Sequence, residues 1–287
     1  MSDKKIPKGA AGTSPEGERI QKVLARVGVG SRRQVERWIE EGRVTVGGRR
    51  ATLGQRVTPQ HVIRVDGRLL PRSTAIPKRR ILMYHKPAGE MCTRSDPQGR
   101  PTVFDRLPRL RSGRWISIGR LDFNTSGLLL LTTDGELANR LMHPRHGIER
   151  EYAARILGKV DEAMLKRLTK GVRLKDGPAR FECVVDAGGE GANRWYHVTL
   201  KEGRHHEVRR MWETMGVKVS RLIRVRYGPV ALPRHLRAGR LMDLDQDATQ
   251  ALLHAVGLDE EKKKRQPRRT RNPSTKRKRS RAKTARR

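Results

Sequence analysis

Cysteine, clustered acidic residues and long apolar runs are all scarce in this 287-residue sequence, and each shortage excludes a class of protein. The two cysteines, Cys92 and Cys183, lie far apart and in no Cys-x-x-Cys pattern, which excludes a disulfide framework and a sulfur-ligated zinc site. No apolar run is longer than the four leucines at 128–131, far too short for a membrane-spanning helix. Acidic residues form no cluster suited to two metal ions, which argues against an RNA-cleaving enzyme.

Targeting signals and repeats are also absent. Residues 1–17 contain no apolar core, so we expect a short disordered leader there and not a secretory signal. No internal repeat recurs at a fixed period, which disfavours a solenoid. The sparse cysteines suit a reducing compartment, and together these features predict a cytoplasmic protein.

Positive charge is what the sequence has in excess. It contains 65 Lys and Arg against 30 Asp and Glu, a formal net charge of +35. Such a chain repels itself unless a polyanion neutralises it, so nucleic acid is the expected partner, well ahead of a membrane surface. Residues 262–287 hold fifteen Lys or Arg and no acid, which predicts a disordered basic tail over 259–287. The remaining +20 predicts that the folded body is basic as well.

A compact module of helices and short strands is expected over residues 18–70. Apolar residues at 20, 23, 24 and 27 have helical spacing and predict a short helix that ends near residues 28–30. Ser31 and Gln34 form a capping box at the start of a second helix, which Gly42 ends. Short strands are expected at 44–46 and 61–65, each followed by a tight turn.

The stretch QKVLARVGVGSRRQVERWIEEGRVTVGG resembles the S4 RNA-binding domain, with its two helices, its Ser-Arg-Arg cap and its following strand. A two-helix packing module with solvated arginines is the plainer alternative. The resemblance implies that the basic residues of this module contact RNA, namely Arg32, Arg33, Arg37 and Arg43.

A second domain with an α+β fold is expected over 81–258, after a linker at 71–80 that is rich in Pro, Arg, Ser and Lys. Strands are predicted at 115–118, 128–132 and 152–156, and a helix at 135–142. Thr133 and Glu136 suggest a capping box for that helix.

The most informative stretch is GRLDFNTSGLLLL at 119–131, which places Asp122 in a loop between two strands. Gly119 and Gly127 allow sharp turns on both sides of it. By spacing alone, a β-hairpin whose Asp caps its own turn is the simpler interpretation. The segment, however, resembles the Gly-Arg-Leu-Asp motif of the RsuA and RluB branch of bacterial RNA pseudouridine synthases. The segments YHKPAGEMCTRSDPQGRPTVFDRLP and TTDGELANRLMHP fit the same family, closest to its members that act on large-subunit (23S) ribosomal RNA.

The resemblance implies that Asp122 is the catalytic residue. It also implies a mainly antiparallel sheet in the catalytic domain and the isomerisation of a uridine to pseudouridine. This reaction breaks a C1′–N1 bond and makes a C1′–C5 bond, so no cofactor is expected. A non-catalytic S4-type ribosome-assembly factor is the alternative, and such a protein has no need of the Asp122 carboxylate.

Further site residues follow from the same resemblance. In GRHHEVRR at 203–210, Arg209 is expected to pair with Asp122, with Arg210 as the alternative, and Glu207 stands where many relatives have Gln. Tyr152 resembles the aromatic residue of a Lys-x-Tyr element, with Arg150 in place of Lys, although a core role is also open. Supporting or RNA-contacting roles are expected for Arg120, Arg204 and Arg210. Solvent or phosphate is the plainer expectation for several of the arginines of this region, which are Arg204, Arg209, Arg210, Arg221 and Arg224.

No metal or dinucleotide site is predicted. The pairs His143 with His146 and His205 with His206 lack a third and a fourth ligand in the sequence. The glycines at 188–191 do not open a helix after a strand, so a loop is expected there. The expected partner is ribosomal RNA, and the expected oligomeric state is a monomer.

Overall fold

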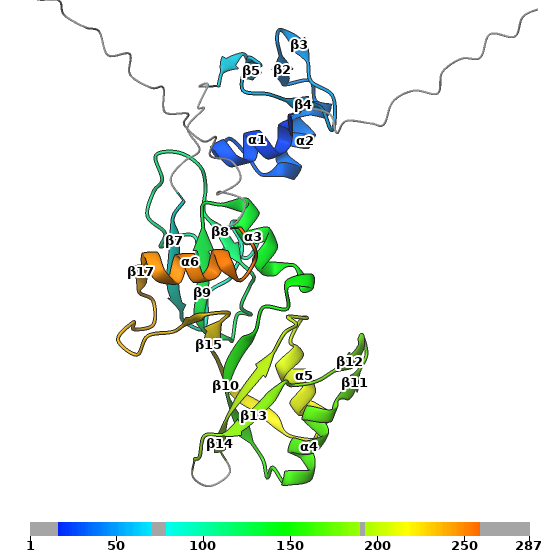
Figure 1. Ribbon diagram of the computed structural model, residues 1–287, viewed down its shortest axis with the longest axis vertical. Helices are drawn as coiled ribbons and strands as arrows, with labels where there is room; N and C mark the ends of the chain where they lie inside the picture. The colour runs from blue at the N-terminus through cyan, green and yellow to red at the C-terminus, as the bar shows by residue number, and fades with distance from the viewer. Residues whose placement is uncertain (1–16, 71–78, 190–192, 259–287) are drawn as a thin grey trace, which may run out of the picture.

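The computed structural model describes residues 17–70, 79–189 and 193–258, which form a small N-terminal module and a larger domain (Figure 1). The predicted leader, most of the predicted linker, part of the 188–191 loop and the predicted tail lie outside the described residues. No helix in the three described ranges combines the length and apolarity that crossing a bilayer requires.

The N-terminal module packs two helices against short strands. Its elements are β1 (Glu18–Arg19), α1 (Ile20–Val27), α2 (Arg32–Glu40), β2 (Val44–Val46), β3 (Arg49–Arg50), β4 (Arg56–Val57), β5 (Ile63–Val65) and β6 (Arg68–Leu69). The predicted capping box is present, since Ser31 accepts from the backbone of Gln34 while the Gln34 side chain accepts from the backbone of Ser31. Gly28 ends α1 in a left-handed conformation, as predicted.

The larger domain is built on a nine-stranded sheet. Its strands are β7 (Ile81–Lys86), β8 (Ile116–Ile118), β9 (Ser126–Thr132), β10 (Arg150–Leu157), β13 (Cys183–Asp186), β14 (Asn193–Leu200), β15 (Lys218–Tyr227), β16 (Val230–Ala231) and β17 (Leu241–Asp243). The main order is β13-β14-β10-β15-β9-β7-β17, and every pairing is antiparallel except that of β15 with β9. The predicted α+β class with a mainly antiparallel sheet is confirmed.

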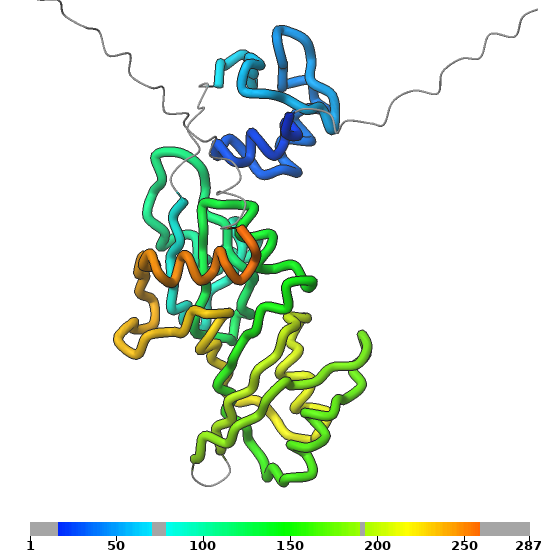
Figure 2. The backbone as a smooth tube through the Cα atoms, viewed as in Figure 1, coloured from blue at the N-terminus to red at the C-terminus, as the bar shows by residue number. Residues whose placement is uncertain are grey.

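Helices cover the two halves of this sheet. They are α3 (Gly135–Met142), the 3-10 turn η1 (Pro144–His146), α4 (Glu162–Lys170), α5 (Glu207–Glu213) and α6 (Gln246–His254), and a small hairpin of β11 (Val172–Leu174) and β12 (Gly177–Ala179) lies beside them. In Figures 1 and 2, α6 crosses the β7–β9 half, whereas α4 and α5 lie against the half that contains β10 and β14. Alternate residues of β7 enter opposite cores: Leu82 and Tyr84 belong to the cluster that contains Trp115, whereas Ile81 and Met83 belong to the cluster that contains Leu137 of α3 and Leu252 of α6.

The predicted capping box at α3 is wrong, although the helix spans the predicted residues. Asp134 is the N-cap, and its carboxylate accepts from the backbone N–H groups of Glu136 and Leu137. The Thr133 hydroxyl instead accepts from the backbone N–H of Arg80. A competing tertiary contact therefore removes Thr133 from the cap.

The two domains touch where α1 ends. The backbone N–H of Gly113 donates to the carbonyl of Val27 at 3.3 Å, and Lys22 lies 3.9 Å from Glu136. A Cβ atom on Gly28 would lie 2.5 Å from the carbonyl oxygen of Gly113, so this approach requires glycine. The N-terminal module therefore contacts the larger domain directly.

Candidate active site

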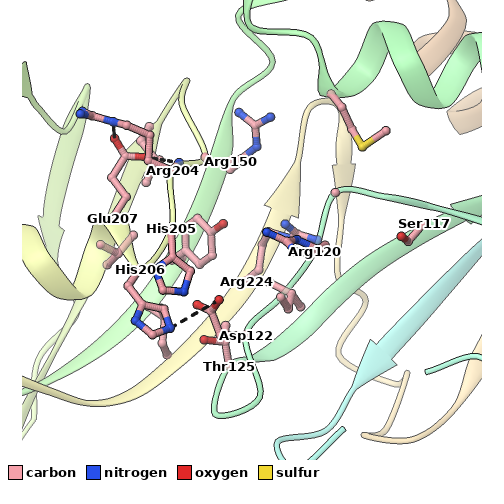
Figure 3. A pocket seen from close by; sticks show the side chains of 18 residues that line it. Ser117, Arg120, Asp122, Thr125, Arg150, Arg204, His205, His206, Glu207 and Arg224 are labelled. Carbon is pink, nitrogen blue, oxygen red and sulfur yellow. Dashed lines mark hydrogen bonds and ion pairs between the residues drawn. The ribbon is translucent and has the colours of Figure 1, made fainter. Parts of the chain in front are cut away.

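A cleft of about 470 Å³ opens where the two halves of the sheet meet, a size that suits a nucleotide. Four segments form its walls: the β8–β9 loop, β10, the segment leading into α5, and β15. Figure 3 shows these side chains converging on one space. The lining residues include Arg120, Asp122, Thr125, Arg150, Tyr152, Arg204, His205, His206, Glu207 and Arg224.

The β8–β9 loop owes its course to two glycines. Gly119 and Gly127 have φ angles of +76° and +109°, in the region that favours glycine. A Cβ atom on Gly127 would also lie 2.3 Å from the carbonyl oxygen of Arg224. Glycine therefore lets β9 and β15 approach in parallel, with Gly127 opposite Arg224, and brings Arg224 beside the loop.

Lys86 fixes the loop from beneath. Its side chain is fully buried at the end of β7, and its ammonium group donates to the carbonyls of Pro87, Asp122 and Thr125 at 2.9, 3.1 and 3.0 Å. Burial lowers the pKa of Lys86, and the nearby carboxylates of Glu90 and Asp122 oppose that effect. The backbone on both sides of the Asp122 carboxylate is therefore tied to the sheet.

The carboxylate of Asp122 faces the cleft. The turn is closed by the backbone, since the N–H of Thr125 donates to the carbonyl of Asp122 at 3.0 Å. The side chain is 35% exposed and lies 3.6 Å from Nε2 of His206, the pair joined by a dashed line in Figure 3. A hairpin Asp that merely caps its own turn does not describe this arrangement.

Arg224 is the most deeply buried cation of the cleft. It is only 2% exposed, and its Nε donates to the carbonyl of Leu128 at 2.7 Å. Its Nη2 is buried and has no hydrogen-bond partner among the residues that the structure describes. The expectation of a solvent- or phosphate-facing arginine is therefore wrong for Arg224.

Tyr152 serves both the core and the cleft. It lies on β10 directly opposite Arg224 in register, is 9% exposed, and packs in the core cluster that contains Trp212. It also lines the cleft near Asp122. The core role of Tyr152 is present in the structure, and its active-site role stays a prediction.

Arg209 and Arg210 form no ion pair with Asp122 among the described residues. Arg209 donates to the carbonyls of Val219 at 2.8 Å and Asn124 at 3.1 Å, so both its terminal nitrogens are engaged with backbone. Arg210 makes a two-fold contact with Asp176 at 2.9 Å, which raises the pKa of Arg210. Arg209 therefore makes no ion pair with the Asp122 carboxylate, contrary to expectation. It donates to the carbonyl of Asn124 and so supports the loop that carries Asp122.

Glu207 is satisfied locally. It is 4% exposed and accepts from the backbone N–H and the Nε of Arg204 at 3.0 and 3.1 Å. Arg204 also donates to the carbonyl of Pro178 at 2.7 Å. Arg150 is similarly anchored, because its Nη1 donates to three carbonyl groups, including that of Lys201 at 2.7 Å.

The other arginines expected to contact RNA are exposed, but they differ in how strongly they are paired. Arg32, Arg33 and Arg37 project from α2 into solvent, as predicted. Arg43 is exposed but binds Asp66 at 2.7 and 2.8 Å. Arg120 is exposed at the rim of the cleft.

The fold brings the Asp122 carboxylate close to His205 and His206. Their rings stack with centroids 3.9 Å apart, and one ligand atom from each ring lies within 4.8 Å of the other and of an Asp122 oxygen. Asp122 is distant in sequence, so the pair could not be assigned this third neighbour from spacing.

Comparison with known proteins is consistent across both domains. Residues 18–63 match the family model of the S4 domain, and residues 80–214 match that of the RNA pseudouridylate synthases. A solved structure described as a crystal structure of pseudouridylate synthase aligns with a TM-score of 0.58 at 28% identity, covering 82% of this chain and 99% of that chain.

The chain belongs to the RNA pseudouridine synthase family, whose members are isomerases, and carries an S4 domain in front of its synthase domain. Two relatives are named ribosomal large subunit pseudouridine synthase B. The one from Pseudomonas aeruginosa is 60% identical over 246 residues, which cover 85% of this chain and 64% of the relative. The one from Salmonella typhimurium is 59% identical over 247 residues, which cover 85% of each chain. The resemblance seen in the sequence is confirmed.

Proposed function

We propose that this protein isomerises a uridine of large-subunit (23S) ribosomal RNA to pseudouridine, with Asp122 as the catalytic group. The observation that supports this most is the carboxylate itself, held on a fixed loop and turned into a nucleotide-sized cleft. The other carboxylate of the cleft, Glu207, is already neutralised by Arg204. The choice of RNA rests on the names of the relatives, which act on the large ribosomal subunit.

The chemistry needs one ionised carboxylate and a way to hold the base. The C1′–N1 bond of uridine breaks, the uracil turns, and a C1′–C5 bond forms, so atoms and electrons balance without a cofactor. Asp122 can act by attack on C1′, by removal of a sugar proton, or by attack on the uracil ring. In each route the carboxylate acts in its ionised form.

Neighbouring side chains supply recognition. The ring of Tyr152 offers a face on which a flipped uracil stacks. Arg224 lines the same cleft, and its buried Nη2 has no hydrogen-bond partner within the described part of the chain. Four arginines against two carboxylates line the cleft, so its field attracts the phosphates of the target nucleotide. Arg120 at the rim, with Arg204, is placed to contact that backbone.

The remaining positive charge binds RNA away from the chemistry. Arg32, Arg33 and Arg37 project from one helix of the S4 domain and suit phosphate contacts. The fifteen basic residues at 262–287 add affinity without specifying sequence. We propose that the protein works in the cytoplasm as a monomer.

Replacement of Asp122 by Asn tests the proposal, because Asn keeps the shape and loses the charge and the nucleophile. We expect the purified variant to bind a large-subunit RNA fragment normally and to form no pseudouridine in a single-turnover assay. Asp247→Asn, at an exposed position of α6, is the matched control and should retain the wild-type rate. A binding-only assembly factor predicts no turnover by the wild type either, and appreciable turnover by Asp122→Asn removes that residue from catalysis.

A further inference from the structure

His205, His206 and Asp122 are arranged like the ligands of a transition-metal site. Nε2 of His206 lies 3.6 Å from Oδ1 of Asp122, and the ligand atoms of all three residues lie within 4.8 Å of one another. In a tetrahedral zinc site with bonds of roughly 2.0–2.1 Å, neighbouring ligand atoms are about 3.3 Å apart. The Asp122–His206 distance is close to that value. The two imidazole rings are stacked with centroids 3.9 Å apart, so binding of one ion by both requires them to turn apart. Figure 3 shows both imidazoles beside the Asp122 carboxylate, with a dashed line from His206 to it.

The backbone holds His206 in place for this arrangement. Its φ and ψ of 52° and 26° are left-handed, one of only two such non-glycine positions among the described residues. His206 occupies the N-cap of α5, yet its side chain makes no capping hydrogen bond. The imidazole is therefore not engaged in capping α5, and it lies 3.6 Å from the Asp122 carboxylate.

We propose that Asp122, His205 and His206 bind a transition-metal dication of the Zn²⁺ class, with water in the remaining position. Two imidazoles and one carboxylate are ligands that suit Zn²⁺, Ni²⁺ and Cu²⁺, whereas Mg²⁺ prefers a set of oxygen ligands. The side chains of Asp122 and His206 are 35% and 44% exposed, so an ion reaches them from solvent. The arginines of the cleft oppose a cation, which keeps the site reversible and not permanently occupied.

A metal ion bound at this site would block the isomerisation, and this step of the inference rests on the proposed function. The ion takes the lone pair of the Asp122 carboxylate that the isomerisation requires, and its hydration shell fills the space of the uracil. Zinc therefore acts as a reversible inhibitor that competes with RNA for the cleft, while Mg²⁺, which RNA assays contain, leaves the site free.

Direct binding tests the site without reference to activity. Untagged full-length protein, freed of metal with a chelator, is titrated calorimetrically with Zn²⁺. We expect one ion per chain in the cleft, bound at least about tenfold more weakly by His206→Asn and by His205→Gln. Asn tolerates the left-handed backbone at residue 206, so that variant keeps its fold. His254→Asn, at an exposed position of α6, is the matched control and should bind as the wild type does. Equal zinc affinity in all four proteins overturns the proposal.

Inhibition is then measured as the ratio of single-turnover rates with and without Zn²⁺ for each protein. The expected ratio is low for the wild type and for His254→Asn, returns to one on chelation, and stays near one for His206→Asn. Equal inhibition of wild type and His206→Asn assigns the effect to the RNA or another site and overturns the inference. Zinc binding by the wild type combined with an active Asp122→Asn defeats the proposed function alone. An inactive Asp122→Asn combined with a wild type that binds no zinc defeats only the metal site.

Discussion

Replacement of Lys86 by Met removes the ammonium group that holds the Asp122 loop, while keeping an unbranched side chain of similar length. The wild-type group is fully buried and donates to the carbonyls of Pro87, Asp122 and Thr125. The thioether of Met can donate to none of them. The substitution should therefore loosen the backbone on both sides of the catalytic carboxylate.

Two opposing terms set the size of the effect. Hydrogen bonds to a charged donor contribute about 1.5–3 kcal/mol each, and the variant makes none of the three. In the opposite direction, burial of the ammonium group costs the wild type several kcal/mol, and the variant avoids this cost. The same burial lowers the pKa of Lys86. The net decrease should be about 3 kcal/mol of unfolding free energy. Domains of this size have about 5–15 kcal/mol, so the variant should stay folded.

Urea unfolding followed by tryptophan fluorescence measures the loss of stability. Single-turnover pseudouridine formation at saturating RNA measures the loss of activity. Lys159→Met, at an exposed position, is the matched control and should change neither. We expect Lys86→Met to lose both stability and turnover while RNA affinity stays near the wild-type value. A variant as stable and as active as Lys159→Met would refute the role given to Lys86.

Three other predictions concern the cleft and the tail. Arg224→Gln should lower turnover at saturating RNA by roughly a hundredfold, since it removes the buried cation that lines the same cleft as Asp122. Arg209→Met should lower it less, because Arg209 donates only to backbone carbonyls. The reverse order of single-turnover rates would return the pairing role to Arg209. Tyr152→Leu should remove the stacking of the base, about 1–3 kcal/mol, so that the catalytic efficiency falls while the binding of RNA fragments without uridine at the target does not. Deletion of residues 262–287 should weaken RNA binding and reduce the slope of log affinity against log salt by about 0.7 for each phosphate that the tail neutralises; an unchanged slope would show that the tail does not bind RNA.

Local features of the fold could be predicted from the sequence because their causes lie within a few residues. The capping box of Ser31 and Gln34 and the bounds of α3 depend on neighbouring groups, and the structure agrees with both. The glycines that flank the Asp122 loop could be assigned for the same reason, since positive φ is a local property. Where a distant group competes, as Arg80 does for Thr133, the local prediction is wrong.

The partners of Asp122 could not be predicted, because they depend on how strands far apart in the sequence pair. Arg224 reaches the cleft only because Gly127 lets β15 lie parallel to β9 at that point. The sequence shows several arginines between 204 and 226, and nothing in their spacing marks the one that becomes buried. The approach of His206 to Asp122 could not be predicted for a similar reason, since the two residues belong to segments far apart in the sequence.

The central claim is that Asp122 converts a uridine of the large-subunit RNA to pseudouridine. The most direct test maps pseudouridines at single-nucleotide resolution in ribosomal RNA from cells that lack the protein, and from the same cells supplied with wild type or with Asp122→Asn. We predict that one or a few positions in the large-subunit RNA lose the modification, regain it with the wild type, and stay unmodified with Asp122→Asn. Restoration of the modification by Asp122→Asn, or an identical map in all the cells, would contradict the account.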